Sequence, residues 1–323
     1  MTGCYLGIDV GSVSTNFVLI DENGNLLKKL YLRTAGRPIE AITNGLKMIQ
    51  EGLEGDIKIL GVGTTGSGRK LAAVIVGADV VKNEITAHAM ACIAEYPDAR
   101  TILEIGGQDS KIIILRDGVV VDFAMNTVCA AGTGSFLDRQ AQRLGIPIER
   151  FGEIALMSKN PTRIAGRCAV FAESDMIHKQ QMGYKIEDIL KGLCQALVRN
   201  YLANVAKGKE IRPPIVFQGG VAANTGIKKA FEEELGVEII IPRYFDVMGA
   251  LGAAILAKKF MAQNKRVKTK FAGFEAAFRE HTAGSFECQG CPNLCEVVQI
   301  YVDGKLAARW GDRCGRWSAS MAV

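Results

Sequence analysis

The sequence predicts an α/β protein of two lobes, each built from the same β-hairpin and helix unit, followed by a small cysteine-rich C-terminal module. A strand, glycine turn and second strand within residues 5–20 return near residue 102, and in both places strands then alternate with helical patterns. Four cysteines gather after residue 285, in a segment too small for a hydrophobic core of its own. Duplication therefore predicts the lobes, and cysteine content predicts the module.

Hydrophobic periodicity places the remaining elements. Between the two hairpins we expect a helix at 39–53, a strand at 57–62 and a glycine-rich loop at 63–68 that leads into another helix. After the second hairpin we expect helices from near residues 130 and 169 and over 186–207, a strand at 215–218, a helix at 224–235, a strand at 237–241 and a small-residue helix at 249–259.

Length and composition indicate a globular protein of about two domains. Of the 323 residues, 48% are hydrophobic and 23% are charged. The net charge of +5 is mild and most basic residues are dispersed, so we expect no nucleic-acid partner. An apolar run of about 18 residues and a signal-peptide pattern are both lacking, so we expect no membrane association and a cytoplasmic location.

The first hairpin carries the groups expected of a phosphate-binding turn. A glycine lets backbone N–H groups approach phosphate oxygens without a Cβ in the way, and hydroxyls add further donors. The residues assigned to the nucleotide here are Gly11, Ser12, Ser14 and Thr15. Asp9 ends the first strand, where a carboxylate can hold Mg²⁺ through water and take part in hydrolysis.

The second hairpin repeats the order of carboxylate, glycine and hydroxyl, with residues 103–110 matching residues 8–15. It supplies the catalytic candidates Glu104, Gln108 and Asp109 and the nucleotide-binding candidates Gly106, Gly107 and Ser110. Two such turns facing each other would clamp the phosphates, with a carboxylate or Gln108 positioning the attacking water. One glycine turn alone is more often plain hairpin chemistry, but two matched copies favour a nucleotide site.

A third glycine turn, with Gly219 and Gly220 between a strand and a helix that begins near Asn224, suits close backbone approach to ribose and adenine. The order of two phosphate turns and an adenosine turn resembles the actin, sugar-kinase and chaperone-ATPase superfamily. That resemblance implies ribonuclease H-like lobes that bind ATP or ADP with Mg²⁺, and small-residue helices that cross at a hinge. Residues 84–92 and 249–254 fit these helices, although a tightly packed core helix fits the second equally well.

Nine cysteines in a chain expected in the cytosol suggest metal or redox chemistry rather than disulfides. Cys129 and Cys168 each precede a predicted helix, whose N-terminal N–H groups stabilise thiolates and the negative charge of an iron–sulfur cluster. A four-thiolate cluster would then require a twofold homodimer in which each subunit contributes this pair. The alternative is that both are buried apolar cysteines, as most free cysteines are.

Three motifs favour the cluster: IGGQDSK at 105–111, NTVCAAGTGSF at 126–136 and GRCAVFAESDMI at 166–177. Over about residues 3–260 the chain closely resembles activators of 2-hydroxyacyl-CoA dehydratases and the related BadF/BadG/BcrA/BcrD-like ATPase subunits of benzoyl-CoA reductases. The resemblance implies one [4Fe–4S] cluster bridging two subunits through Cys129 and Cys168, and reduction by a ferredoxin or flavodoxin. It also implies ATP-gated transfer of one low-potential electron to a partner iron–sulfur dehydratase in anaerobic metabolism. Gly132 and Gly134 join the cofactor-binding candidates.

The C-terminal tail departs from the simplest activators. Its four cysteines follow a CxxCxxxC pattern and a predicted hairpin with strands at 297–300 and 305–310; they are Cys288, Cys291, Cys295 and Cys314. Four thiolates at turn-like spacing suit tetrahedral zinc or a second iron–sulfur centre, and the sequence leaves both open. The remaining cysteines, Cys4, Cys92 and Cys194, are predicted to be core residues.

We therefore expect four regions, which are a first lobe at 1–95, a second lobe at 96–260, a linker at 261–284 and a metal-binding tail at 285–323. The predicted activity is an ATPase coupled to electron transfer. The residues themselves leave two alternative functions open. A small-molecule kinase of the same fold would need a catalytic aspartate but no cluster cysteines, and a nucleotide-dependent sensor or scaffold would bind ATP and a partner without electron transfer.

Overall fold

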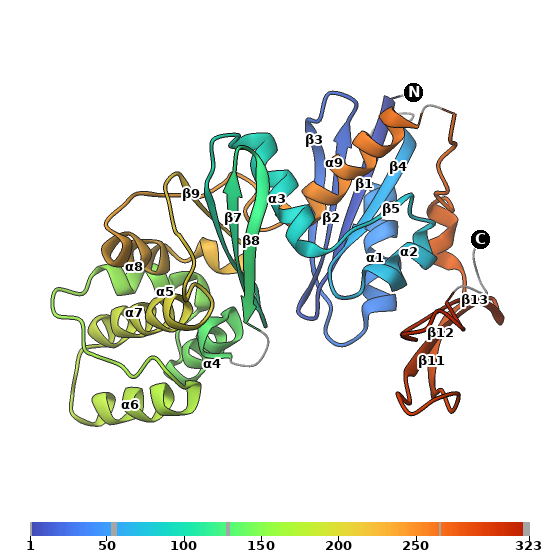
Figure 1. Cartoon of the computed structure of the whole chain (residues 1–323). Coiled ribbons are helices and arrows are strands. Elements are labelled where there is room, and N and C mark those ends of the chain that lie inside the picture. Colours follow the sequence, from blue (N-terminus) through green and yellow to red (C-terminus); the bar gives the residue numbers. More distant parts are fainter. Residues whose placement is uncertain (1, 53–56, 127–129, 265, 319–323) are drawn as a thin grey trace. The chain divides into compact units, whose positions relative to one another are not determined.

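The computed structural model describes residues 2–52, 57–126, 130–264 and 266–318. The chain forms two compact units, Met1–Ala87 with Gly249–Val323, and His88–Met248. It passes from one unit to the other within helix α3 (Glu84–Glu95) and returns at the first residue of helix α9 (Met248–Gln263). Figure 1 labels the elements of both units.

The sheet of the first unit has the strand order β3-β2-β1-β4-β5. Its strands are β1 (Thr2–Val10), β2 (Ser14–Asp21), β3 (Leu26–Arg33), β4 (Ile57–Thr65) and β5 (Val80–Val81). The first three strands pair antiparallel, and β4 and β5 run parallel to β1. The hairpin strands and the strand from residue 57 that the sequence predicts are confirmed.

Helices cover both faces of this sheet (Figure 1). On one face α1 (Pro38–Glu51) and α2 (Arg69–Val76) pack over the fully buried Leu6 and Ile8 of β1. On the other face a Cβ at Gly7 would lie 1.9 Å from the carbonyl oxygen of Ala250 in α9. Only glycine admits so close an approach. Helix α9, assigned to the second lobe from the sequence, therefore belongs by its contacts to the first unit.

The sheet of the second unit repeats the strand order of the first. It runs β8-β7-β6-β9-β10, with β6, β7 and β8 antiparallel and β9 and β10 parallel to β6. The strands are β6 (Thr101–Ile105), β7 (Ser110–Arg116), β8 (Val119–Asn126), β9 (Ile215–Gln218) and β10 (Ile239–Ile240). Each unit is thus one copy of the same topology, as the duplicated glycine turns predict.

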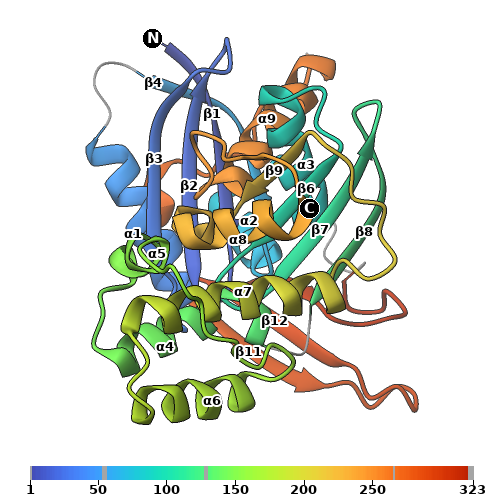
Figure 2. The ribbon, with the colours of Figure 1, turned by 90° about the vertical axis from the view of Figure 1, so that its left-hand side faces the viewer.

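Helices of the second unit gather against its sheet, as Figure 2 shows for α4 to α8. They are α4 (Gly134–Leu144), α5 (Ile148–Leu156), α6 (Ala169–Gln181), α7 (Ile186–Asn204) and α8 (Thr225–Leu235). The core joins α7, α8 and β9 through edge-to-face ring contacts of Phe231 with Tyr201 and Phe217, at centroid distances of 5.4 and 5.3 Å. Helix α6 lies at the edge of this group, against α7.

The chain after α9 packs onto the first unit. A 3-10 helix, η3 (Phe274–Phe278), and the sheet β11-β12-β13 follow; the strands are β11 (His281–Glu287), β12 (Glu296–Val302) and β13 (Lys305–Trp310). The predicted β12–β13 hairpin is confirmed. Residues 266–284, within the linker expected at 261–284, instead pack against the first unit: Asp79 accepts hydrogen bonds from Thr269 and Lys270, and Ala276 and Ala277 enter the core. These contacts join positions too far apart in sequence to be predicted.

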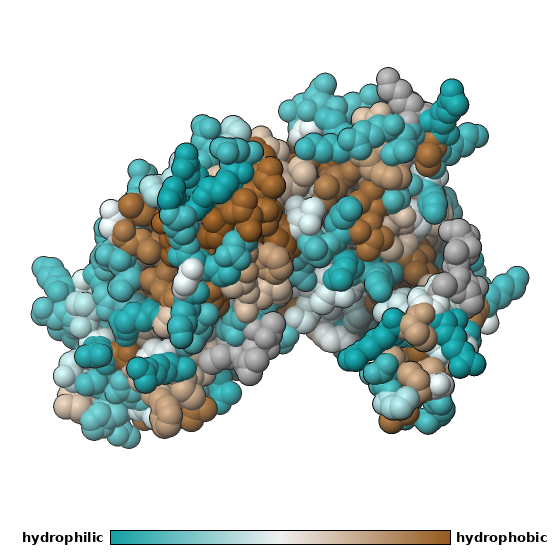
Figure 3. Space-filling view, viewed as in Figure 1, coloured by the Kyte–Doolittle hydropathy of each residue, from teal (hydrophilic) through white to brown (hydrophobic). Residues whose placement is uncertain are grey.

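Apolar side chains also reach the surface. Four alternate residues on edge strand β8 are exposed, Val119, Val121, Phe123 and Met125, and Figure 3 shows hydrophobic surface over β7 and β8. Among the described helices, none combines the length and the hydropathy needed to cross a membrane.

Candidate functional site

The turn between β1 and β2 is held by its own backbone and by threonines. The N–H of Gly11 donates to the carbonyl oxygen of Ser14 at 2.9 Å, and the hydroxyl of Thr34 donates to the carbonyl of Gly11 at 2.8 Å. Thr15 is fully buried, and its hydroxyl shares a 2.9 Å hydrogen bond with that of Thr34. Thr15 thus braces the turn, whereas Ser12 is exposed at its surface.

The glycine-rich loop between β4 and α2 lies beside Asp9. Gly66 has φ of +91°, and a Cβ there would lie 2.5 Å from Oδ1 of Asp9 and 2.4 Å from the carbonyl oxygen of Val10. The guanidinium of Arg69 donates to the carbonyl oxygen of Gly66 at 3.0 Å. Sequence reasoning noted the glycines of this loop but assigned them no role, although glycine in such a loop is itself a signal of close backbone approach.

The turn between β6 and β7 repeats the first. The N–H of Gly106 donates to the carbonyl oxygen of Asp109 at 3.0 Å, as that of Gly11 does to Ser14. Gln108 is exposed at the turn. Ser110 is fully buried, and its hydroxyl has no hydrogen-bond partner within the described residues. Its predicted contact with the nucleotide therefore stays a prediction.

A buried ion cluster lies beside the second turn. The Nζ of Lys111 lies 3.0 Å from Oε2 of Glu104 and 2.9 Å from Oδ2 of Asp109. The side chains of Lys111 and Glu104 are only 2% and 5% exposed, and that of Asp109 is 40% exposed. Sequence reasoning missed Lys111, because a lysine next to a turn is usually solvated; its place inside the IGGQDSK motif was the available signal.

The turn at Gly219 and Gly220, predicted to bind adenosine, adjoins the same carboxylate. Gly219 has φ of +90°, and a Cβ there would lie 2.4 Å from the carbonyl oxygen of Ile105 and 2.8 Å from Oε1 of Glu104. Glu104 therefore lies next to both glycine turns of the second unit. Asn224 caps α8, with its side-chain oxygen accepting from the N–H of Ile227 at 3.1 Å, so that oxygen serves the helix.

Two neighbouring side chains of this cluster are uncharged at neutral pH. Burial and the charge of Lys111 lower the pKa of His88 to about 3, and its Nδ1 lies 2.8 Å from Nε2 of Gln218. Burial and the charge of Glu104 raise the pKa of Tyr201 well above 10. The Tyr201 hydroxyl donates to the carbonyl oxygen of Lys111 at 2.7 Å. Both side chains act through hydrogen bonds rather than charge.

Helix α4 begins directly on the turn between β6 and β7. The N–H of Gly134 donates to the carbonyl oxygen of Gly106 at 2.9 Å. The N–H and the hydroxyl of Ser135 both donate to the carbonyl oxygen of Gly107, at 2.8 and 2.6 Å. A Cβ at Gly134 would lie 3.0 Å from the Gly106 oxygen, so this position is crowded. The turn and the NTVCAAGTGSF motif thus share a direct backbone connection.

Cys168 lies immediately before α6 and is partly exposed. Helix α7 holds the loop that leads to it: Asn200 donates to the carbonyl oxygen of Gly166 at 2.6 Å, and Arg199 donates to that of Ile164 at 2.8 Å. A cavity of about 780 Å³ opens beside Cys168. Its basic lining residues are Arg163, Arg167 and Arg199. The lining of the cavity beside Cys168 is therefore rich in positive charge.

Comparison with known sequences matches residues 6–257 to the BadF/BadG/BcrA/BcrD ATPase family. The chain belongs to this family. It is 35% identical over 260 residues to the 2-hydroxyisocaproyl-CoA dehydratase activator of Clostridioides difficile, covering 78% of this chain and 94% of the relative. It is 34% identical over 264 residues to the (R)-2-hydroxyglutaryl-CoA dehydratase activating ATPase of Acidaminococcus fermentans, covering 80% and 98%.

Solved structures give the same result for the fold. The activator of the 2-hydroxyisocaproyl-CoA dehydratase from Clostridium difficile with bound ADPNP superposes with a TM-score of 0.72 and 32% identity, over 82% of this chain and 98% of that one. The fold is that of the actin-like ATPases, and the resemblance drawn from the three motifs is confirmed. This BadF/BadG/BcrA/BcrD ATPase family member continues for a further segment after residue 257, where the match ends.

The family member's second predicted cluster ligand, Cys129, lies outside the described residues. Within the described ranges, no three histidine, cysteine or acidic side chains come together as a group that could hold a metal ion. Cys168 is therefore the described part of the expected cluster site.

The tail cysteines do not converge either. The N–H of Cys288 donates to the carbonyl oxygen of Cys295 at 2.8 Å, which closes their loop. The indole N–H of Trp317 lies 3.2 Å from Sγ of Cys288 and, with the N–H of Gly290, lowers the pKa of that thiol. All four tail cysteines lie in the described part of the chain, where no metal-holding group is found, so the expected four-thiolate centre is not formed in this structure.

The other three described cysteines are core residues, as predicted. Cys4, Cys92 and Cys194 are fully buried. Burial raises the pKa of all three thiols, to about 12 for Cys92 and Cys194. They stay protonated at neutral pH and do not serve as thiolate ligands.

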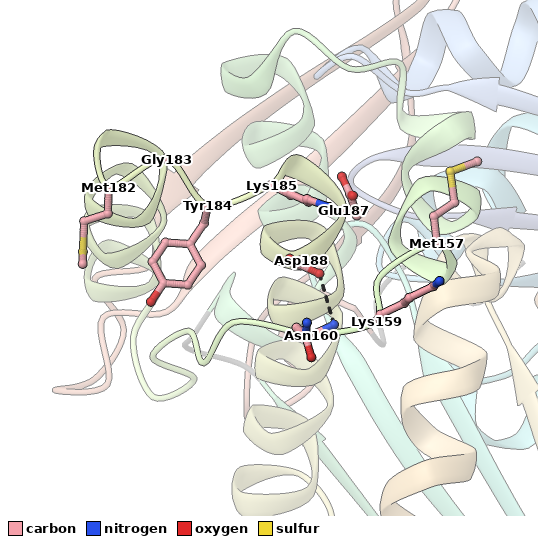
Figure 4. A pocket seen from close by; sticks show the side chains of 9 residues that line it. All are labelled: Met157, Lys159, Asn160, Met182, Gly183, Tyr184, Lys185, Glu187 and Asp188. Atoms are coloured by element: carbon pink, nitrogen blue, oxygen red, sulfur yellow. Dashed lines mark hydrogen bonds between the residues drawn. The ribbon is translucent and has the colours of Figure 1, made fainter.

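A further cavity of about 480 Å³ lies where α6 is connected to α7 (Figure 4). Asp188 accepts hydrogen bonds there from the Ser158 hydroxyl at 2.6 Å and the Asn160 N–H at 3.4 Å. The charged lining residues Lys159, Lys185, Glu187 and Asp188 are of both signs. The cavity contains none of the predicted site residues and favours no class of ligand.

Proposed function

We propose that this protein is an ATP-dependent reductase that activates an iron–sulfur dehydratase of the 2-hydroxyacyl-CoA type. The single observation that best supports the proposal is the hydrogen bonding of the second phosphate turn to the start of α4, through Gly106, Gly107, Gly134 and Ser135. A change in the bound nucleotide would be transmitted by these hydrogen bonds from the turn to the start of α4, which follows Cys129 in the sequence. Family membership and the dehydratase-activator relatives support the same reading.

In this proposal both glycine turns bind the phosphates of ATP. Gly11, Ser12 and Ser14 present N–H and hydroxyl donors in one unit, and Gly106 and Gly107 do so in the other. Asp9 holds Mg²⁺ through water. Gln108, or the carboxylate of Glu104 or Asp109, orients the attacking water. Gly219 and Gly220 leave room for the adenosine.

The cysteines of the second unit are proposed to hold one [4Fe–4S] cluster between two copies of the chain. Cys168 fits this role because it is partly exposed, lies at the start of α6 and adjoins a cavity lined by three arginines. Helix N-terminal N–H groups and arginines favour the negative charge of thiolate-ligated iron. The bound cluster would supply one low-potential electron, received from a ferredoxin or flavodoxin and passed to the partner dehydratase.

The test measures iron, acid-labile sulfide and electron paramagnetic resonance on protein purified without oxygen and reduced with dithionite. We expect iron for one [4Fe–4S] cluster per dimer, its loss in Cys168→Ala, and its retention in Cys291→Ala, which removes an exposed tail thiol instead. Both variants should still bind ATP. Asp9→Ala should retain iron and lose ATP hydrolysis.

Iron that persists in Cys168→Ala but disappears in Cys291→Ala would assign the cluster to the tail and contradict the proposed ligands. A wild-type protein that takes up no iron on reconstitution would contradict the reductase proposal. In that case phosphorylation of a small molecule would indicate a kinase, and ATP-dependent partner binding without electron transfer would indicate a sensor.

A further inference from the structure

The carboxylate of Glu104 lies between two glycine turns and a buried lysine. Its Oε2 lies 3.0 Å from Nζ of Lys111. Its Oε1 lies 3.3 Å from where a Cβ of Gly106 would be and 2.8 Å from where a Cβ of Gly219 would be. Oε2 therefore contacts Lys111, and Oε1 faces both the turn at Gly106 and the turn at Gly219.

Burial by itself disfavours the ionised form of this carboxylate. A carboxylic acid removed from water takes up a proton far more readily, and a paired cation is what keeps it ionised. Among the described residues, the titratable groups that face the pair include Asp109 on the turn, His88 on α3 and Tyr201 on α7. His88 and Tyr201 are uncharged at neutral pH and Asp109 is acidic, so none of these three compensates Glu104, whereas Lys111 does.

We propose that Lys111 is a positioning residue for ATP hydrolysis, which keeps Glu104 ionised and facing the phosphate turn while holding Asp109 against that turn. An ionised Glu104 can orient the attacking water and accept its proton, whereas a protonated Glu104 can do neither. The inference rests on the proposed ATPase site and specifies which group sets the charge of its base.

The test compares Lys111→Met, Lys111→Arg and a matched control, Lys209→Met. Lys209 also contacts a carboxylate, Asp122 at 2.7 Å, but this pair lies outside the cluster and the carboxylate is half exposed. We measure the affinity for a fluorescent ATP analogue and the kcat and KM of ATP hydrolysis between pH 5 and pH 9.

For Lys111→Met we expect kcat at neutral pH to fall about 100-fold with little change in KM, because the base is lost and binding is kept. The acidic limb of the kcat profile should move up past neutral pH, since a 100-fold loss at pH 7 requires Glu104 without its cation to be mostly protonated there. Lys111→Arg should show the wild-type acidic limb of the kcat profile and most of the wild-type kcat. Lys209→Met should match the wild type.

A second variant tests the proposal even if Lys111→Met does not fold. The double variant Glu104→Gln with Lys111→Met contains neither buried charge, and we expect it to fold, bind the ATP analogue and hydrolyse ATP as slowly as Glu104→Gln alone. A wild-type pH profile in Lys111→Met, or wild-type hydrolysis by the double variant, would overturn the role of Lys111. Absence of ATP hydrolysis in the wild-type protein would overturn the proposed ATPase site as well.

Discussion

Gly252 of α9 faces the backbone of Ala87 in α3 so closely that a Cβ on Gly252 would lie 1.8 Å from the Ala87 carbonyl oxygen. These two helices are also where the chain passes between its units. The small-residue segments that the sequence assigned to a hinge therefore contact each other directly, and glycine is the residue that allows this contact.

A side chain at position 252 should separate the two helices. We expect Gly252→Val to lower the free energy of unfolding by about 1 to 3 kcal/mol, because the added atoms overlap backbone that cannot move away freely. Ala262→Val, at an exposed position of the same helix, is the control for placing valine in a helix. It should change the free energy of unfolding by less than about 0.7 kcal/mol. Urea unfolding monitored by circular dichroism measures both, and equal effects would contradict the close contact.

Position 66, in the loop beside Asp9, should also not tolerate a side chain. Gly66→Ala would place a Cβ against Asp9 and Val10, so we expect affinity for Mg·ATP to fall about tenfold or more through displacement of the turn. Gly36→Ala is a matched control, because Gly36 also has positive φ, of +73°, but nothing lies within 4 Å of its Cβ position. Isothermal titration should show unchanged affinity for that control. Similar losses in both variants would point to backbone strain alone.

Ser135 should couple the nucleotide turn to α4. Ser135→Ala removes the hydroxyl hydrogen bond to Gly107, which contributes about 1 kcal/mol. Under the proposed function we expect ATP hydrolysis to persist while the number of electrons delivered per ATP falls about fivefold. Ser174→Ala is the control, because the Ser174 hydroxyl donates to the Val170 carbonyl within α6 at 3.0 Å. An unchanged ratio of electrons to ATP in Ser135→Ala would remove Ser135 from the coupling path.

The buried His88 predicts a pH dependence of stability. Its pKa is about 3 in the folded protein, below that of an exposed histidine near 6.5, so its contribution is complete above pH 6.5 and is lost as the pH falls toward 3. The slope for one such group approaches about 1.4 kcal/mol per pH unit. Chemical unfolding between pH 4 and pH 7 should show a flatter dependence in His88→Gln than in the wild type. Equal slopes in the wild type and in His88→Gln would contradict this assignment.

The local parts of the site could be predicted from the sequence. The turns at Gly11 and Gly106 follow from glycine, hydroxyl and carboxylate spacing, which acts over a few residues. Lys111 and His88 could not be predicted, because their burial depends on elements far away in the chain. The same holds for Thr15, which braces a turn through Thr34 instead of presenting its hydroxyl at the surface.

Packing between distant segments also explains the differences in the fold. Helix α9 was assigned to the second lobe because it follows that lobe in sequence, but its carbonyl at Ala250 lies against Gly7. The tail cysteines satisfy the spacing of a metal site, whereas the loop that contains them closes through backbone hydrogen bonds and an indole contact. The spacing predicted that the four thiols come together at a metal, whereas among the described residues they form no metal-holding group.

The family match ends at residue 257, but the hydrophobic core of the first unit does not. Ala276, Ala277 and Ile300 are buried among the side chains of β1, α1 and α2. Truncation of the chain after residue 257 would therefore expose apolar side chains of β1, α1 and α2 that these three residues now cover. The tail is part of the packing of the ATPase fold in this protein and not an appendage that can be removed without loss of stability.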